Sequence, residues 1–341
     1  MRRSILFAFV FCGCCAALLG CGTKGFDSPS KVKTLRVLAV QKRPPYGRPS
    51  STVELSMLYW DGKGGGSRPV EVFWTGRPPL ACYNPPGDLY YNCFTAFGQT
   101  GDAGTAPAPG GTADAGATPR PDGILPPDPI ASYSIPIPAK DAIVTRTQPG
   151  STPYGLAYVF YAVCAGQLGL APEGSSFPIG CFDASHNQLG PADFVAGYSS
   201  VYVYESLPNE NPIVNGIALG GVTATAGPAP HVPRCTESDP DNCPTRSVRP
   251  DIDRASAEVD VDAKGPNGEV YLEQLWVQYY ATGGSFTSAS KLVNDATQGW
   301  NDGYGTDWRI ATEPGPVRIW AVVHDNRGGV AWTEVDAIVD P

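Results

Sequence analysis

The chain has 341 residues, of which 17% are charged, and it carries a formal net charge of −9. An acidic chain repels phosphate groups, so nucleic acid is not expected as a partner. Its 40 glycines and 35 prolines are typical of short strands joined by many turns, and they leave little room for long helices. The composition therefore predicts an all-β protein.

The first 20 residues have the pattern of an export signal. Two arginines precede an apolar run from Ile5 to Gly20, which is too short to span a bilayer comfortably but fits a secretory core. The run ends in Leu18-Leu19-Gly20-Cys21, which resembles a bacterial lipobox. The resemblance implies that a signal peptide, residues 1–20, is removed and that Cys21 is acylated as the first residue of the mature protein.

The residue after Cys21 is Gly22. An Asp at this position would resemble an inner-membrane retention signal, so Gly22 implies anchoring in the outer membrane, on its periplasmic or its outer side. Each buried CH₂ of an acyl chain contributes about 0.8 kcal/mol, so several chains hold a protein on a bilayer indefinitely. The small and polar residues 21–33 are then expected to form a flexible tether.

Strand signals follow this tether. Leu35 to Val40 predicts a first strand, and Thr52 to Trp60 a half-buried one with its odd-numbered apolar residues on one face. Tyr154 to Cys164 is the most apolar run of the mature chain and is the expected central strand. Residues 101–130 are nearly all Gly, Ala, Pro, Thr and Asp, and predict a disordered insertion within a first domain at 34–207.

A second domain is expected at 208–341, after a proline-marked turn. Ala257 to Ala263 alternates apolar and mostly acidic residues, which predicts a strand with its apolar side inward. Val317 to His324 and Val330 to Val339 flank a polar turn rich in glycine and predict a β-hairpin, with His324 at an exposed or edge position. Two sets of about six or seven short strands favour two antiparallel β-sandwiches in tandem.

The second strand set resembles immunoglobulin-like and PKD-like repeats. Leu272 to Val277 and Arg318 to Asp325 are similar to the C and F strands of those families. The mature chain also resembles uncharacterised Ig-like lipoproteins of Gram-negative bacteria through Arg36–Leu38, Tyr279–Phe286 and the Asp325–Gly329 turn. These resemblances imply two Ig-like sandwiches behind a lipoprotein signal peptide, and they imply no activity, because a fold does not determine a function.

Cysteine spacing predicts disulfides. Apart from Cys21, the mature chain has an even set of cysteines that fall into three close pairs, as expected for an oxidising compartment. Such a set allows several connectivities, and proximity along the chain favours Cys82–Cys93, Cys164–Cys181 and Cys235–Cys243. Each closed loop contributes roughly 2–3 kcal/mol to stability by the chain-entropy argument. Metal ligation is the rival interpretation, but the sequence has no C-x-x-C pair.

Acidic residues near the last cysteine pair give one metal hypothesis, a structural calcium ion. Hard oxygen ligands at alternate positions suit Ca²⁺, and the segment looks a little like one end of a thrombospondin-type calcium repeat, although it lacks the D-x-D-x-D-G core. A solvated acidic loop is the alternative, and no other cofactor is expected. The candidate ligands are Glu237, Asp239, Asp241, Asp251 and Asp253.

The sequence contains no nucleophile elbow, H-E-x-x-H or Walker motif. We therefore expect no enzyme, but a cell-envelope lipoprotein acting as a structural or protein-interaction module, with the membrane and another envelope protein as partners. A carbohydrate-binding surface lipoprotein is the alternative, and a hydrolase is a third. Aromatic side chains would stack on sugar rings, although those of the Cys82–Cys93 loop could instead pack over its disulfide. The candidates are Tyr83, Tyr90, Tyr91, Trp300 and Trp308.

Overall fold

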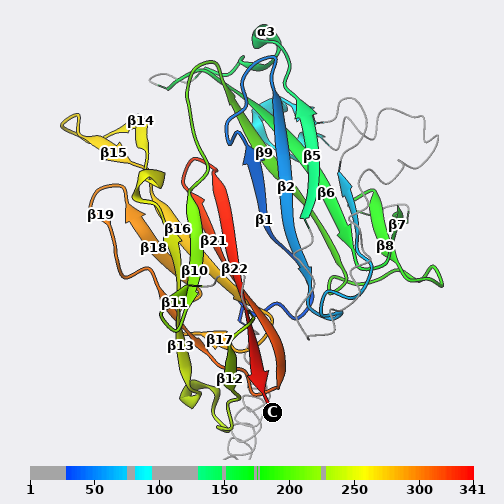
Figure 1. Cartoon of the computed structure of the whole chain (residues 1–341). Helices are drawn as coiled ribbons and strands as arrows, with labels where there is room; N and C mark the ends of the chain where they lie inside the picture. Colours follow the sequence, from blue (N-terminus) through cyan, green and yellow to red (C-terminus); the bar gives the residue numbers. More distant parts are fainter. Residues whose placement is uncertain are drawn as a thin grey trace, which may run out of the picture.

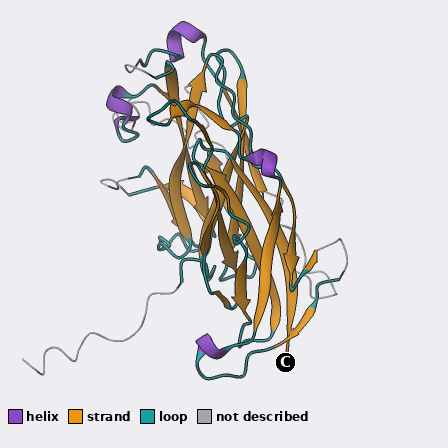
Figure 2. Ribbon diagram, turned by 90° about the vertical axis from the view of Figure 1, so that its left-hand side faces the viewer, coloured by secondary structure: helices purple, strands orange, loops and turns teal. Residues whose placement is uncertain are grey.

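Strands are the main regular elements of the described structure, and its helices are short. The computed structural model describes residues 28–74, 81–93, 130–147, 151–172, 175, 177–223 and 228–341. Each named sheet takes its strands from one side of the connection between Tyr204 and Val214. Figure 1 shows the two resulting bodies lying against each other, and Figure 2 shows strands running along the long axis of the molecule. The fold is all-β, as predicted.

The first body is a sandwich of two antiparallel sheets. One has the order β1-β2-β5, and in the other β6 lies between β9 on one side and the short strands β3 and β4 on the other. Leu55 and Val159, from opposite sheets, are fully buried in one core cluster. β6 is thus the predicted central strand. The bounds are β1 Leu35–Arg43, β2 Thr52–Asp61, β3 Glu71–Trp74, β4 Cys82–Tyr83, β5 Ile130–Pro136, β6 Tyr154–Cys164 and β9 Phe194–Tyr204.

Short elements surround this first sandwich. A hairpin of β7 (Gln167–Leu170) and β8 (Ile179–Phe182) follows β6, and α3 (Lys140–Ile143) lies between β5 and β6 in the chain. Of the insertion expected at 101–130, only Ile130 is among the described residues, as the first residue of β5. Among the described residues, no helix is long and apolar enough to cross a membrane.

The second body is a sandwich with immunoglobulin-like strand order. One sheet is β11-β10-β13-β20-β17, and the other is β12-β22-β21-β16-β18-β19, in which β12 joins β22 in parallel. The pairings β10-β13-β20-β17 and β22-β21-β16-β18 reproduce the ABED and GFCC′ sheets of that fold, except that β17 precedes β18 in the chain. The bounds are β10 Val214–Leu219, β11 Val222–Thr223, β12 His231–Pro233, β13 Thr245–Ile252, β16 Leu275–Ala281, β17 Ser285–Phe286, β18 Ser290–Asp295, β19 Gly299–Trp300, β20 Thr306–Arg309, β21 Gly315–Asp325 and β22 Val330–Asp340.

The predicted C-terminal hairpin is present. β21 and β22 pair antiparallel from Gly315↔Val339 to His324↔Val330, around the turn at residues 326–329. Between the two sheets, Val277, Trp308 and Val323 are fully buried in a core cluster of their own. Each sandwich therefore has its own hydrophobic core, as expected for units built from two packed layers.

The two sandwiches also share a buried contact. Leu58 and Trp60 of β2 pack in one cluster with Trp320 and Val322 of β21, and all four side chains are 0% exposed. The rings of Trp60 and Trp320 meet edge-on with their centroids 5.3 Å apart. β2 is therefore buried on both faces, so the prediction of a half-buried strand was wrong, because its even-numbered side chains are covered by the second sandwich.

Two other expectations also need correction. Residues 28–33 were assigned to the tether, but Lys31 forms a parallel bridge to Ala281, and Val32 is only 1% exposed. The run from Ala257 to Ala263 was expected to turn its apolar side inward. Instead it forms β14 (Val259–Lys264), which pairs only with β15 (Val270–Leu272), and Val259 and Val261 are about half exposed. Figure 1 shows this hairpin projecting from the second sandwich.

Candidate functional site

The three predicted disulfides are formed. The Cα atoms of Cys82 and Cys93 are 5.8 Å apart, those of Cys164 and Cys181 5.4 Å, and those of Cys235 and Cys243 5.3 Å. All three distances lie within the usual range for a disulfide. These bonds therefore fix loops, and the first of them positions the candidate site.

The Cys82–Cys93 loop lies on the outer face of β6. Leu156, Tyr158 and Phe160 point to this outer side, and they are buried in a small cluster with Cys93. The loop also carries Tyr90 over the neighbouring strand β9, where its ring stacks on that of Tyr198 with a centroid distance of 4.4 Å. The disulfide thus places a loop tyrosine on a strand tyrosine that is more than 100 residues away in the sequence.

The alternation of β9 supplies the rest of the site. Val201 and Val203 are fully buried in the sandwich core, so the even-numbered residues between and around them point outward. Tyr198 and Tyr202 are 42% and 39% exposed, and on the loop Tyr90 and Tyr91 are 39% and 52% exposed. We call the group of Tyr90, Tyr91, Tyr154, Tyr198, Tyr202 and Tyr204 the tyrosine face.

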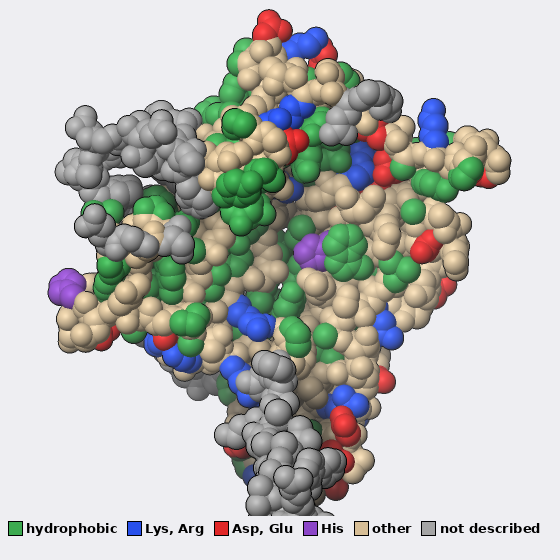
Figure 3. All heavy atoms as spheres, turned by 180° about the vertical axis from the view of Figure 1, so that it is seen from behind, with side chains coloured by type: hydrophobic (Ala, Val, Ile, Leu, Met, Phe, Trp, Pro, Cys, Tyr) green, Lys and Arg blue, Asp and Glu red, His purple; other side chains and the backbone are tan. Residues whose placement is uncertain are grey.

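The rings of the tyrosine face support one another. Tyr202 and Tyr204 are nearly parallel, with an interplanar angle of 15° and a centroid distance of 6.5 Å. Tyr154 of β6 lies 5.8 Å from Tyr202, and the buried Tyr46 lies 4.7 Å from Tyr204. Figure 3 looks onto the side of the molecule opposite to that of Figure 1. It shows hydrophobic side chains, which include tyrosine, at the surface of the first sandwich in the upper part of the view. The result is an aromatic surface supported from below.

Asp88 and Arg146 are paired with each other beside the tyrosine face. Asp88 forms an ion pair with Arg146, and its Oδ2 accepts a hydrogen bond of 2.8 Å from the Tyr154 hydroxyl. The Tyr158 hydroxyl donates to the backbone carbonyl of Asp88 over 2.6 Å. The hydrogen bond to Asp88, together with burial, raises the pKa of Tyr154 above its ordinary value. The phenol of Tyr154 is therefore uncharged at neutral pH.

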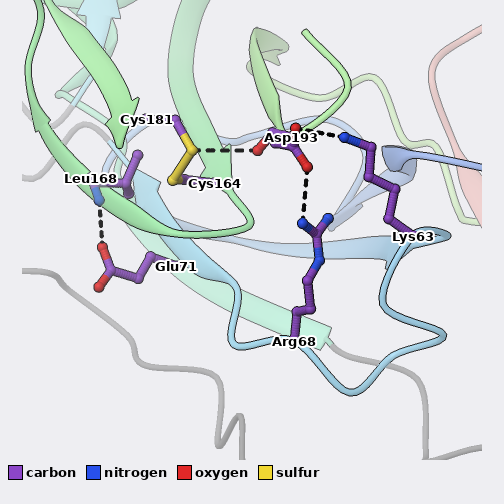
Figure 4. Close-up of a disulfide and its surroundings, with 7 residues drawn as sticks. All are labelled: Lys63, Arg68, Glu71, Cys164, Leu168, Cys181 and Asp193. Carbon is purple, nitrogen blue, oxygen red and sulfur yellow. Dashed lines mark hydrogen bonds and ion pairs between the residues drawn. A yellow bond between two sulfur atoms is a disulfide. The ribbon is translucent and has the colours of Figure 1, made fainter. Parts of the chain in front are cut away.

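The other end of β9 is anchored by an ionic network, shown in Figure 4. Asp193, next to the first residue of β9, accepts hydrogen bonds from Lys63 Nζ at 2.7 Å and from Arg68 Nη1 at 2.9 Å. Its backbone carbonyl lies 3.4 Å from the sulfur of Cys181, whose disulfide partner is Cys164 at the end of β6. Both strands that carry the tyrosine face are thus tied down at this end.

The other aromatic candidates lie elsewhere. Trp308 is 0% exposed, and its Nε1 donates to the Gly283 carbonyl over 2.9 Å, so it belongs to the core of the second sandwich. Trp300 is half-buried, with its ring edge-on to Tyr304 and the Arg254 guanidinium 5.4 Å away. Trp308 is therefore too deeply buried to stack on a sugar ring, whereas Trp300 lies on the second sandwich, apart from the loop tyrosines.

The three loop tyrosines divide between packing and exposure. Tyr83 packs against the core of the first sandwich, and its hydroxyl donates to the carbonyl of Pro136. Tyr90 and Tyr91 remain exposed on the tyrosine face. Tyr198 and Tyr202 were not among the predicted site residues, although Tyr202 alternates with the valines of β9 in the sequence.

The calcium candidates are not brought together. Asp239 accepts a hydrogen bond from the backbone N–H of Asp241, and the Asp241 carboxylate pairs with Arg309 at 3.3 Å. Asp251 and Asp253 lie at the far end of β13, where Asp253 caps a short 3₁₀ turn. Within the described ranges no group of three or more metal-ligating side chains is present. The proposed set, including Glu237, does not form one site.

A polar cluster is buried where the two sandwiches meet. Arg327 Nη1 donates to Glu273 Oε1 over 2.7 Å, and Glu273 is 0% exposed. Lys42 Nζ donates over 3.1 Å to the carbonyl of Ser200, which lies in β9 between the tyrosines. Burial lowers the pKa of Lys42 to about 8, although the Asp325 carboxylate raises it in part. This cluster links the backbone of the tyrosine face to the second sandwich.

His324 is not the exposed or edge residue that was expected. Its ring is stacked on Trp276 at 5.2 Å, and its Nε2 is buried with no hydrogen-bond partner among the described residues. Burial lowers the pKa of His324 to about 4. A neutral imidazole therefore belongs to the folded state, whereas the unfolded chain takes up a proton near pH 6.5.

Acid is therefore expected to destabilise the protein through His324. Stability from this group is fully present above about pH 6.5 and is lost as the pH falls towards 4, by an amount on the order of 3 kcal/mol. His324→Phe, which keeps the stacking on Trp276, should remove that part of the pH dependence. Urea unfolding of both proteins at pH 4 and pH 7 checks this, and equal pH dependence in the two would contradict it.

Comparisons with known proteins add little to this geometry. No family model matches the sequence, and no curated protein matches it. Among solved structures, the chain is similar to the FN1–FN3 domains of chicken CNTN1, at 11% identity and a TM-score of 0.21, covering 89% of this chain and 64% of that one.

Two bacterial structures show a similar degree of likeness. For latent PorU from Porphyromonas gingivalis the identity is 10%, the TM-score 0.20, and the coverage 91% of this chain and 24% of that one. For Salmonella alpha-2-macroglobulin reacted with methylamine, the identity is 12% and the TM-score 0.18, and the match covers 94% of this chain and 16% of that one. The chain thus spans less than two thirds of each of these structures. The immunoglobulin-like fold stands on the chain's own strand order.

Proposed function

We propose that this chain is a non-catalytic ligand-binding module of the cell envelope, anchored in the outer membrane through lipid on Cys21. The observation that carries the proposal is the tyrosine face, on which four tyrosines are 39–52% exposed. Exposed aromatic side chains that gather on one face in this way mark interaction sites on folded proteins. Another envelope molecule, a protein or a glycan, is then the ligand.

The position of the N-terminal segment supports this function. Ser28 to Val32 lies beside Ala281, at the end of the first sandwich where β1 begins. The Tyr204 end of β9 lies beyond the other end of β1, where Gly47 exchanges backbone hydrogen bonds with β9. β1 has nine residues and spans roughly 30 Å. Tyr202 and Tyr204 therefore lie at the end of the first sandwich remote from Ser28, so a lipid attached ahead of Ser28 would leave them away from the anchor.

The lipid anchor is tested by Cys21→Ser, a residue outside the described part of the chain. We expect the variant to leave the membrane fraction and to lose incorporation of radiolabelled palmitate, because three acyl chains bind a bilayer far more strongly than a folded surface does. Cys15→Ser, within the same signal segment, is the matched control and should stay membrane-bound. Membrane attachment and labelling that survive in Cys21→Ser would contradict the anchor.

The binding function is tested in the native cells. The tagged chain with Cys21 intact is cross-linked mildly and isolated, and the attached material is measured as protein by mass spectrometry and as sugar by composition analysis. We expect enrichment that is lost in the double variant Tyr198→Ala/Tyr202→Ala. Leu170→Ala, which removes another exposed side chain (66% exposed), is the control and should behave as wild type. Equal enrichment by all three proteins would refute the proposal.

A further inference from the structure

We infer that the ligand of the tyrosine face is an uncharged glycan chain that lies along β9; this inference rests on the proposed function. Three features of the face support a neutral polyol as its ligand: its shape, its charge, and the ring contacts that hold its tyrosines in place. Each is a property of the described residues.

The shape of the face suits an extended chain. Tyr198, Ser200, Tyr202 and Tyr204 follow one another on the outer side of one strand, so a small side chain separates two large ones. From Tyr198 to Tyr204 the strand rises roughly 20 Å, at ~3.3 Å per residue. Tyr90 and Tyr91 extend the aromatic surface beyond Tyr198. Successive rings of a linear polymer can therefore lie on successive side chains.

The charge of the face suits an uncharged ligand. The Asp88 carboxylate and the Arg146 guanidinium neutralise each other. The Asp262 carboxylate, which accepts a hydrogen bond from Thr152 and acts on Tyr204, adds negative charge that would repel a polyanion. Burial raises the pKa of Tyr158 and of Tyr204, so both phenols are neutral. With a net charge of −9 the whole chain repels polyanions. The neutral tyrosines of the face present phenol hydroxyl groups. Such groups can both donate and accept hydrogen bonds, as the hydroxyl groups of a sugar also do.

The rings are held in place before a ligand arrives. Tyr90 is stacked on Tyr198, and Tyr204 is in contact with Tyr46 and Tyr202. Tyrosine has only two side-chain torsions to order, and a supported ring loses less entropy on binding. Aromatic rings that are ordered in advance can therefore bind the rings of a sugar chain at a low entropic cost.

The test uses the full-length lipidated protein in detergent micelles. Its binding is measured by calorimetry to cellohexaose, xylohexaose, mannohexaose and chitohexaose, with hexagalacturonate as the charged comparison. We expect at least one neutral hexasaccharide to bind, and its affinity to rise with chain length from two to about four sugars, the number that a ~20 Å row accommodates. Hexagalacturonate should bind more weakly than the best neutral chain.

Variants decide whether the tyrosine face is the site. Tyr198→Ala and Tyr202→Ala are each expected to weaken binding about tenfold, which corresponds to a loss of ~1.4 kcal/mol. Tyr202→Phe keeps the ring and should lose less than Tyr202→Ala, and Leu170→Ala should bind as wild type. Circular dichroism confirms that each variant is folded. Failure of all four neutral hexasaccharides to bind, or binding that is indifferent to both alanine changes, overturns the inference.

Failure of the glycan inference can be distinguished from failure of the proposed function. If the material captured in native cells depends on Tyr198 and Tyr202, is destroyed by protease and survives periodate, then the face binds a protein. That result overturns the glycan inference alone. If capture does not depend on these tyrosines, the proposed function itself is wrong.

Discussion

Replacing Arg327 by methionine is expected to lower the free energy of unfolding by about 3–5 kcal/mol at pH 9. Arg327 Nη1 donates to Glu273 Oε1 at 2.7 Å, and Glu273 has no exposed surface. Burial is the main cause that raises the pKa of Glu273 to about 8, so at pH 9 the folded protein holds a buried carboxylate that relies on this guanidinium. Without Arg327 the charge is buried and unpaired.

The loss from Arg327→Met should be smaller at pH 6, where Glu273 in the folded state carries a proton. The double variant Arg327→Met/Glu273→Gln carries no charge at either of these two positions. It should therefore recover much of the stability that Arg327→Met loses at pH 9. Chemical denaturation of the three proteins at both pH values measures these differences. A loss that is the same at pH 6 and pH 9, or a double variant no more stable than the single one, would show that the ion pair is not the cause.

Trp60→Ala is the second change with a large expected effect. Trp60 is 0% exposed in the cluster that joins the two sandwiches, and the Arg318 guanidinium lies 5.4 Å from its ring. Truncation of a buried tryptophan costs about 3–5 kcal/mol, because it removes apolar contact and leaves a cavity. Here the cavity opens between two units that each have their own core, so their unfolding should become uncoupled.

Differential scanning calorimetry should therefore show one transition for the wild type and two for Trp60→Ala. Trp276→Ala is the matched control, since Trp276 is only partly buried and stacks on His324, on the same sheet as Trp320. It should keep a single transition and lose less stability. A single transition in Trp60→Ala, with a melting temperature no lower than that of Trp276→Ala, would contradict this role of the ring.

The parts of the fold that were predictable are those encoded locally. The β21–β22 hairpin follows from two alternating runs around one glycine-rich turn. The disulfides follow from pairs of cysteines that lie 8 to 17 residues apart. β6 follows from a continuous apolar run, as expected for a strand buried on both faces. In each case the signal and the structure it specifies lie within a short stretch of chain.

The contact between the sandwiches could not be predicted in this way. Trp60 and Trp320 are 260 residues apart, and the even-numbered face of β2, with Ser56, Leu58 and Trp60, contains a polar residue. Alternation shows which residues share a face, but not that a second body covers that face. For the same reason, Val259 and Val261 alternate well and still remain exposed on the β14–β15 hairpin.

The candidate site was predictable only in part. Tyr90 and Tyr91 were singled out because a loop closed by a disulfide is rich in tyrosine. The sequence places Tyr198 and Tyr202 in a strand but does not show that the Cys82–Cys93 loop lies across that strand, β9. The prediction that Trp308 is exposed to a ligand was wrong. The sequence does not show whether an indole N–H will meet a buried acceptor, which here is the carbonyl of Gly283.

The bridge between Lys31 and Ala281 has a mechanical consequence. Val32 donates its backbone N–H to the Ala281 carbonyl, and Ala281 donates to the carbonyl of Ser30, each over 2.9 Å. A pull applied ahead of Ser28 thus reaches the second sandwich through this bridge before it reaches β1 of the first. The segment runs parallel to its partner strand, so the load would stretch both hydrogen bonds together, in shear. Such a force is thereby shared by both sandwiches.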